Sequence, residues 1–202
     1  MVRELRFAEG ERMRKRVIAL DIGNVCLEIH PERCFAALGY RSAQEIPPEA
    51  LFLASERFER GEVTPAEFLS GFRRLTGTSL SDAELERAFR SIIGPAVPGM
   101  AELVAGLDAR GFRPVFFSDT SVTHLDEVRR KFPAAPAVPD GIYSYEVHAK
   151  KPEKAMFEAF EARFGVPAFY FDDRAELIEG ALRHGWNAHR FVSAEEMNRI
   201  LG

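Results

Sequence analysis

Cysteine is scarce in this chain, and long apolar runs are missing from it. The two cysteines, Cys26 and Cys34, do not form a CxxC pair, so the sequence offers no disulfide framework and no cysteine metal site. We expect both to be reduced, partly buried thiols of a cytoplasmic protein. No apolar stretch approaches the roughly 18 residues that a membrane helix needs, and the N-terminus lacks the apolar core of a signal peptide. We therefore expect no membrane partner.

A strong excess of positive charge is also missing. The formal net charge is −4, so no global basic field would attract nucleic acid, and we expect no nucleic-acid partner. Positive charge gathers at the N-terminus, where a basic nucleic-acid-binding arm stays open as an alternative to the favoured frayed or strand-leading N-terminus. The basic residues of this stretch are Arg3, Arg6, Arg12, Arg14, Lys15 and Arg16.

The chain does have short apolar runs that end in polar side chains. Its 202 residues and 46% hydrophobic content suit one core with a smaller inserted lobe. Strands expected near residues 16–22, 113–117 and 168–171 lead to Asp21, to Ser118-Asp119 and to Asp172-Asp173. After residue 110 strand and helix signals alternate, which predicts an α/β fold, a Rossmann-like doubly wound parallel sheet. The carboxyl ends of parallel strands share one edge, so these polar tips should form one site.

Residues 28–94 carry helix signals and no convincing strand. Thr64-Pro65-Ala66-Glu67 and Ser81-Asp82-Ala83-Glu84 are capping boxes, each followed by an apolar stripe at helical spacing, and Ile92 and Ile93 are assigned to the second stripe. Further helices are expected from Pro31 and over residues 48–60. We therefore divide the chain into an α/β core, residues 1–27 and 95–202, and a four-helix insert, residues 28–94.

Three carboxylates meet at the expected edge, those of Asp21, Asp172 and Asp173. At an effective dielectric constant near 20 each pair would repel by about 4 kcal/mol, and the single Lys151 cannot offset three charges. A hard divalent cation can, and Mg²⁺ prefers one or two carboxylates with water and a substrate phosphate. Such a site predicts a small phosphorylated substrate. Asp21 would attack phosphorus and form an aspartyl-phosphate. Lys151 would stabilise the negative charge of the phosphoryl group, and Ser118 would hold a phosphate oxygen.

The same residues resemble the haloacid dehalogenase (HAD) superfamily. Asp21-Ile22-Gly23-Asn24-Val25, Ser118, Lys151-Pro152 and Phe171-Asp172-Asp173 stand in that family's order and spacing, from about Val17 onward, and Ile178-Glu179-Gly180-Ala181 resembles its last motif. The resemblance implies a phosphatase whose Mg²⁺ is held by Asp21, the backbone carbonyl of Gly23 and Asp173. It implies that Asp172 acts through water and that the insert is a cap that closes over the site.

Two departures from the family pattern affect the expected chemistry. Gly23 stands where most phosphatases of the family have a second Asp that protonates the leaving group. General acid–base help is worth about 10²–10⁴-fold, so a leaving group of low basicity would suffer least from its absence. The Asp-x-Gly-Asn-Val variant resembles a branch acting on α-D-glucose 1-phosphate, which suggests sugar phosphates. Asp119 stands where the family often has Asn, and we expect only its backbone N–H to bind phosphate.

Three other interpretations stay open on the sequence. A HAD-like pseudoenzyme would bind a phosphometabolite or a partner with little turnover, and the missing second Asp would fit it. A metal-independent 2-haloacid dehalogenase would also lack that Asp, but such enzymes lose the acidic pair that this chain keeps. The aspartates could also merely cap turns. Substrate contacts from His30, Arg33, Arg57 or Arg60 are undecided, and we expect His124, His184 and His189 to be ordinary surface or boundary residues.

Overall fold

A parallel five-stranded sheet forms the centre of the computed structural model, which describes residues 15–202. The strand order is β5-β4-β1-β6-β7, and every pairing is parallel. The strands are β1 (Arg16–Leu20), β4 (Phe112–Ser118), β5 (Gly141–Tyr143), β6 (Phe169–Asp172) and β7 (Ala188–Arg190). The predicted α/β, Rossmann-like doubly wound sheet is confirmed. Most of the basic N-terminal stretch lies outside the described residues.

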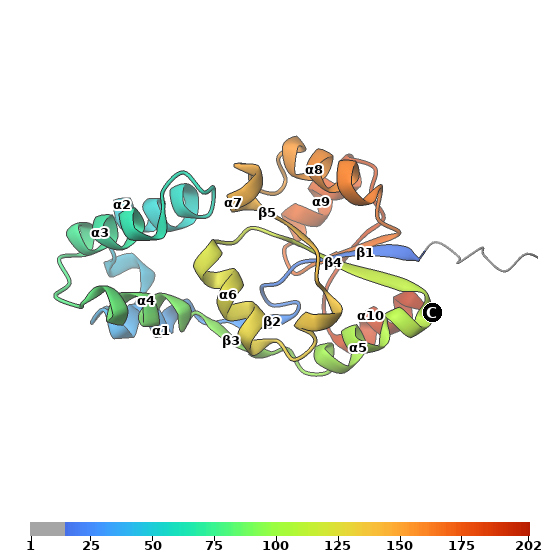
Figure 1. Ribbon diagram of the computed structural model, residues 1–202, viewed down its shortest axis with the longest axis horizontal. Coiled ribbons are helices and arrows are strands. Elements are labelled where there is room, and N and C mark those ends of the chain that lie inside the picture. The colour runs from blue at the N-terminus through green and yellow to red at the C-terminus, as the bar shows by residue number, and fades with distance from the viewer. Residues whose placement is uncertain (1–14) are drawn as a thin grey trace, which may run out of the picture.

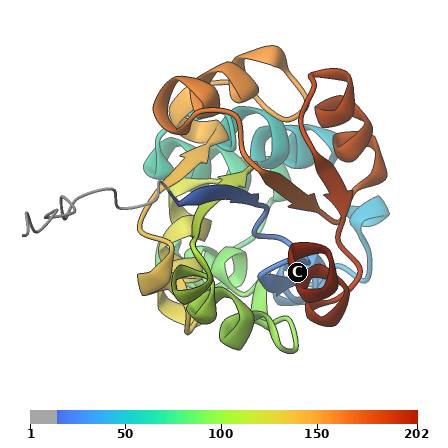
Figure 2. The ribbon, with the colours of Figure 1, turned by 90° about the vertical axis from the view of Figure 1, so that its right-hand side faces the viewer.

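Helices cover both faces of this sheet because its strands alternate apolar side chains between two cores (Figure 2). Ile18 and Leu20 of β1 pack with the helices of one face, and Ala19 packs with those of the other. The first face carries α5 (Met100–Gly106), α6 (Val122–Lys131) and α10 (Ala194–Leu201). The second carries α8 (Lys154–Phe164) and α9 (Ala175–Arg183).

A separate group of helices lies at one end of the sheet (Figure 1). It contains α1 (Pro31–Ala37), α2 (Pro48–Phe52) continuing into a π-helical stretch (Leu53–Phe58), α3 (Pro65–Thr76) and α4 (Asp82–Arg90). Both predicted capping boxes form, at Thr64 with Glu67 and at Ser81 with Glu84. These helices have an apolar core of their own, in which the rings of Phe58 and Phe68 stack 4.2 Å apart.

Two short strands connect the helical insert to the sheet, and the sequence did not predict either. β2 (Leu27–Ile29) and β3 (Ile93–Ala96) pair antiparallel. Ile93 therefore belongs to a strand and not to the stripe of α4, which ends at Arg90. A strand of three or four residues with a Gly-Pro pair inside it carries too little alternation to be recognised. The proposed insert of residues 28–94 begins and ends within this ribbon.

Two other elements differ from their expected form. The residues after β5 turn into a short helix, α7 (Ser144–Val147), where a strand was expected over residues 142–147. A helix was expected over residues 99–110, but α5 is followed by a 3₁₀ turn, Asp108–Arg110. Within the described part of the chain, no helix has the length and apolarity needed to cross a membrane.

Candidate active site

The polar tips of three adjacent strands form the site. β1 lies between β4 and β6, so Asp21 after β1, Ser118 at the end of β4 and Asp172 at the end of β6 come together. The backbone N–H of Asp21 donates to the carbonyl oxygen of Phe171 at 3.0 Å, which continues the ladder past the last residue of β1. The side chains of Asp21, Ser118 and Asp172 are all buried. The expected meeting of these residues at one edge is therefore observed.

Lys151 lies at the centre of the cluster. Its Nζ donates to Asp21 Oδ1 at 2.7 Å, to Asp172 Oδ2 at 2.6 Å and to the carbonyl oxygen of Phe117 at 3.1 Å. The lysine reaches this position from the loop before α8, where Pro152 packs against α9. A Cβ at Gly180 would lie 2.4 Å from Pro152 Cβ, so only glycine permits this approach. The glycine of the last sequence motif thus has a packing role.

Asp172 and Asp173 have different surroundings. The carboxylate of Asp172 is fully buried and accepts hydrogen bonds from Lys151, from the Tyr170 hydroxyl and from the backbone N–H of Arg174. Asp173 is half-buried, and its Oδ2 accepts a hydrogen bond from Asn24 Nδ2 at 3.1 Å. Asp172 is thus occupied by protein donors, whereas Asp173 keeps oxygen lone pairs available for a ligand.

Asn24 is a site residue to which the sequence analysis gave no role. Besides its bond to Asp173, its Oδ1 accepts the backbone N–H of Ile29 at 3.1 Å. Its backbone is left-handed, with φ 54°, a conformation that asparagine tolerates better than most side chains. The Gly-Asn pair directly after Asp21 was the available signal, since such pairs favour left-handed turns.

The donor set fits a hard divalent cation. Oxygen atoms of Asp21, Asp172 and Asp173 lie within 4.8 Å of one another. Lys151 offsets one of the three negative charges, so a charge of two remains when all three carboxylates are ionised. Oxygen ligands and this residual charge match Mg²⁺ better than a soft metal, which prefers sulfur or nitrogen.

Burial and pairing set the protonation of the cluster. Burial raises the pKa of Asp21 to about 7, because the loss of hydration outweighs the attraction of the Lys151 ammonium. Burial also opposes the charge of Lys151, but Asp21, Tyr170 and Asp172 outweigh it and hold the pKa of Lys151 well above its ordinary value. For Asp172, Lys151 and the other donors overcome burial and lower the pKa of its carboxyl. Lys151 and Asp172 are therefore a charged pair.

Asp119 has a structural role that the sequence did not predict. Its Oδ1 accepts the backbone N–H of Lys151 at 2.9 Å, which fixes the loop that carries the lysine. Its Oδ2 is buried and has no hydrogen-bond partner among the described residues. The expectation that only the backbone N–H of Asp119 serves the site is therefore incomplete.

A cavity of about 470 Å³ opens above the cluster, between the sheet edge and the helical insert. The predicted site residues Asp21, Gly23, Ser118, Asp119, Lys151 and Asp173 all line it, and Asp172 lies beneath them. From the other side the insert contributes residues of α1, α2 and α4 together with β2 and β3. A small molecule bound in this space would touch both parts of the chain.

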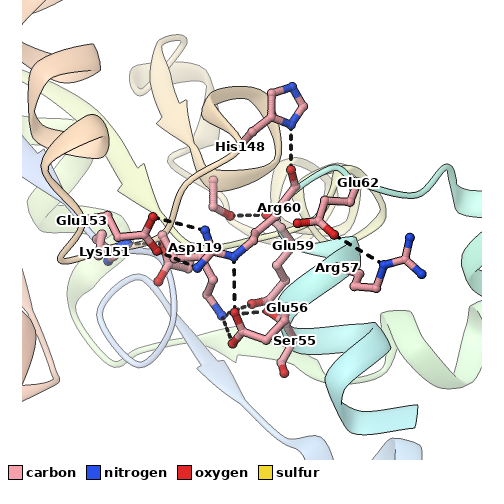
Figure 3. A network of polar contacts seen from close by, with 12 residues as sticks. Ser55, Glu56, Arg57, Glu59, Arg60, Glu62, Asp119, His148, Lys151 and Glu153 are labelled. Carbon is pink, nitrogen blue, oxygen red and sulfur yellow. Dashed lines mark hydrogen bonds and ion pairs between the residues drawn. The ribbon is translucent and has the colours of Figure 1, made fainter. Parts of the chain in front are cut away.

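Polar contacts hold the insert against the core at the rim of the cavity (Figure 3). Lys150 Nζ donates to the carbonyl oxygen of Ser55 at 2.8 Å and to Glu59 Oε2 at 3.0 Å. Arg60 forms a two-pronged ion pair with Glu153, with a shortest distance of 2.6 Å. These contacts join the insert to the core beside the cavity.

Most of the side chains whose role in substrate binding was undecided form ion pairs or hydrogen bonds with other protein groups. Arg60 pairs with Glu56 as well as Glu153, and Arg57 pairs with Glu62. His30 lies between Glu28 and Glu32, 2.9 Å from each, and does not line the cavity. Arg57 and His30 therefore stabilise the insert itself, whereas Arg60 also joins the insert to the core.

His124 is not the surface or boundary residue that the sequence suggested. It is buried at the contact between α6 and α4, where its ring stacks on Phe89 and its Nε2–H donates to the Phe89 carbonyl oxygen at 3.0 Å. Burial lowers the pKa of His124 to about 4, and the nearby Arg90 guanidinium adds to the effect. The position of a residue on one helix does not reveal which other element will pack over it. The expectation for His124 was therefore wrong because of a tertiary contact.

This histidine predicts a pH dependence of stability. The unfolded chain takes up a proton below its pKa near 6.5, whereas the folded protein does so only near 4. The free energy of unfolding should therefore fall between pH 6.5 and 4, by about 2 kcal/mol from pH 6.5 to pH 5. In His124→Gln this contribution should vanish. Urea unfolding of both proteins at pH 7 and pH 5 measures it, and equal pH dependences would contradict the assignment.

Solved structures of known proteins share this architecture. A HAD family enzyme from Bacteroides thetaiotaomicron has a TM-score of 0.79 at 23% identity, and the match covers 93% of this chain and 98% of that one. A predicted HAD-like family hydrolase from Porphyromonas gingivalis has a TM-score of 0.75 at 20% identity, covering 93% and 98%. This chain has the HAD fold. A predicted phosphoglycolate phosphatase from Haemophilus somnus is similar at a TM-score of 0.62 and 12% identity, covering 95% and 100%.

The comparisons with known proteins find the fold through structural similarity and not through overall sequence similarity. No protein-family model and no curated protein matches the chain. The HAD fold is nevertheless matched over nearly the full length of these neighbours, including the helical insert of residues 28–94, since more than nine-tenths of both chains align. The similarity therefore concerns the whole arrangement of sheet, site edge and insert.

Proposed function

We propose that the protein is a Mg²⁺-dependent phosphohydrolase that acts on small phosphorylated metabolites through an aspartyl-phosphate at Asp21. The observation that carries this proposal is the meeting of Asp21 with Lys151 and with Asp172 and Asp173 at the floor of one cavity. Such a group is costly for stability, because buried like charges repel, and it is the arrangement that phosphoryl transfer requires.

The reaction would have two steps. A carboxylate oxygen of Asp21 attacks phosphorus, the bond from phosphorus to the ester oxygen breaks, and the leaving oxygen takes a proton from water. Water then attacks phosphorus of the aspartyl-phosphate, which releases inorganic phosphate and restores the carboxylate. The Lys151 ammonium would stabilise negative charge on the phosphoryl oxygens, and Ser118 would hold one of them.

Magnesium would be held by Asp21, the backbone carbonyl of Gly23 and Asp173, with Asp172 acting through Lys151 and water. When bound, the ion would offset the residual charge of the carboxylates and of the phosphoryl group. The Bacteroides HAD family enzyme, whose fold this chain shares, has been crystallised with magnesium and inorganic phosphate. That complex supports the choice of ion and of ligand class for the present chain.

Replacing Asp173 tests the magnesium assignment. In Asp173→Asn we expect the Mg²⁺ concentration for half-maximal activity to rise at least about tenfold, because a charged ligand becomes neutral. A Mg²⁺ titration of phosphate release measures it, with the exposed Asp126→Asn as the matched control. An unaltered titration in Asp173→Asn would remove Asp173 from the metal site.

The proposal also has a direct test. Purified protein should release phosphate from aryl phosphates or from a panel of sugar, nucleotide and acyl phosphates with Mg²⁺, and a chelator should stop the release. Sugar phosphates are one candidate class, suggested by the sequence resemblance. The absence of an acid at Gly23 favours a second outcome, in which Mg²⁺ and phosphate bind without turnover. Binding without hydrolysis across the whole panel would establish that pseudoenzyme in place of the enzyme.

A further inference from the structure

We propose that the substrate is a phosphate monoester with an apolar, preferably aromatic, organic group, and not a sugar phosphate. This inference rests on the proposed function and specifies its substrate class. It comes from the side of the cavity opposite Asp21. The insert forms this side, which we call the apolar wall. The wall consists of Ile29, Phe35, Leu51, Ala54 and Ile92.

The exposure of the apolar wall indicates that it is a binding surface. All five side chains are half-buried, although they pack at the margins of the apolar cores. Cys34, Phe72 and Phe89 also line the cavity but are buried. An apolar ligand that displaced water from the wall would gain free energy in proportion to the area covered.

The insert offers few free hydrogen-bonding groups to this cavity. Among its described residues that line the space, Ser55 and Glu59 carry the side-chain oxygens, and each already has one hydrogen-bond partner. Ser55 Oγ donates to the carbonyl oxygen of Leu51 at 3.0 Å, and Glu59 accepts from Lys150 (Figure 3). A sugar bound against the apolar wall would leave the hydroxyl groups that face it unpaired, which costs about 1–3 kcal/mol for each buried group.

The chemistry beside Asp21 points in the same direction. A Cβ at position 23 would lie 3.1 Å from Ile29 Cγ1 and 3.8 Å from Asp21 Oδ2. An isoleucine of the apolar wall thus occupies the space into which a second carboxylate would extend. Without a proton donor at that position, a phenol-like leaving group of low basicity departs more easily than an alcohol. The apolar wall and the missing acid therefore both favour an aryl ester.

A matched pair of substrates tests the wall separately from leaving-group basicity. The phenols of 4-isopropylphenyl phosphate and 4-(hydroxymethyl)phenyl phosphate differ little in basicity and greatly in polarity. With Mg²⁺ present we expect kcat/KM to be at least about tenfold higher for the isopropyl ester, because it buries two more carbons and no hydroxyl group. This comparison in the wild-type protein needs no variant, so it decides the proposal even if a variant fails to fold.

Two neighbouring positions on α2 supply the variant and its control. Leu51→Asn should reduce the preference for the isopropyl ester at least fivefold, because an amide replaces an apolar side chain of the wall. Phe52→Asn changes a side chain that is 57% exposed and does not line this cavity, so it should leave the preference unchanged.

The outcomes separate the two proposals. Three results would overturn the apolar substrate class and leave the proposed phosphohydrolase activity intact. They are equal kcat/KM for the two esters, a higher kcat/KM for glucose 1-phosphate than for either ester, and equal effects of Leu51→Asn and Phe52→Asn. No phosphate release from any ester, sugar phosphate or acyl phosphate would overturn the phosphohydrolase, and the substrate class with it.

Discussion

Asp21→Asn should abolish phosphate release, with a loss of at least about 10⁴-fold in kcat, because an amide oxygen cannot take over a phosphoryl group as a carboxylate does. The fold should survive the change. Burial raises the pKa of Asp21 to about 7, so its ionised form costs free energy in the absence of metal. A neutral amide of the same shape avoids that cost. Phosphate release and urea unfolding in the presence of a chelator measure the two effects.

The sign of the stability effect follows from the raised pKa of Asp21. The pKa of Asp21 in the folded protein lies above its ordinary value of 3.8, so ionisation of Asp21 lowers stability progressively as pH rises from about 4 to about 7. Asp21→Asn should therefore be at least as stable as wild type at pH 7.5. Asp126→Asn serves as a control for the loss of one exposed carboxylate. Activity within tenfold of wild type in Asp21→Asn would exclude Asp21 as the nucleophile.

Lys151→Met should lower the free energy of unfolding by about 3–5 kcal/mol at neutral pH, besides abolishing activity. The substitution removes the ammonium between Asp21 and Asp172 and leaves two buried carboxylates without their counter-charge. For a chain of this length the loss corresponds to a fall in Tm of roughly 10 °C. Thermal unfolding in the presence of a chelator measures it.

Added Mg²⁺ should restore part of that loss, because the ion binds the folded carboxylate cluster and not the unfolded chain. The control is Lys154→Met, a change at an exposed lysine that pairs with Glu158 on the surface of α8. Surface pairs of this kind contribute about 0–1 kcal/mol. If Lys151→Met cost no more than Lys154→Met, the buried lysine would not be the counter-charge of the cluster.

The candidate site could be predicted because its signals are local. Each of the three strands is a short apolar run followed at once by a polar tip, and parallel strands place all such tips at one edge. The capping boxes at Thr64 and Ser81 were equally local and formed as predicted. Four separate motifs in order then indicated the HAD fold, which the solved structures confirm.

What the sequence missed depends on partners far along the chain. The β2–β3 ribbon joins segments more than sixty residues apart, and neither strand is long enough to show a period. His124 is buried because α4 of the insert covers it. Lys150 has no visible role until the insert brings Ser55 and Glu59 to it. In each case a neighbour supplied by the tertiary fold decides the role of the residue.

The amino-acid order alone determined the sheet, its polar edge and the identity of the groups at that edge, because strand period and strand ends are properties of a few consecutive residues. Only the tertiary structure decided that Lys151 would sit between Asp21 and Asp172, and that Ile29 would fill the space beside Gly23. Those contacts depend on how the insert and the loop before α8 pack against the sheet edge. Packing of this kind is fixed by shape and charge across the whole molecule, so no single stretch of sequence contains it.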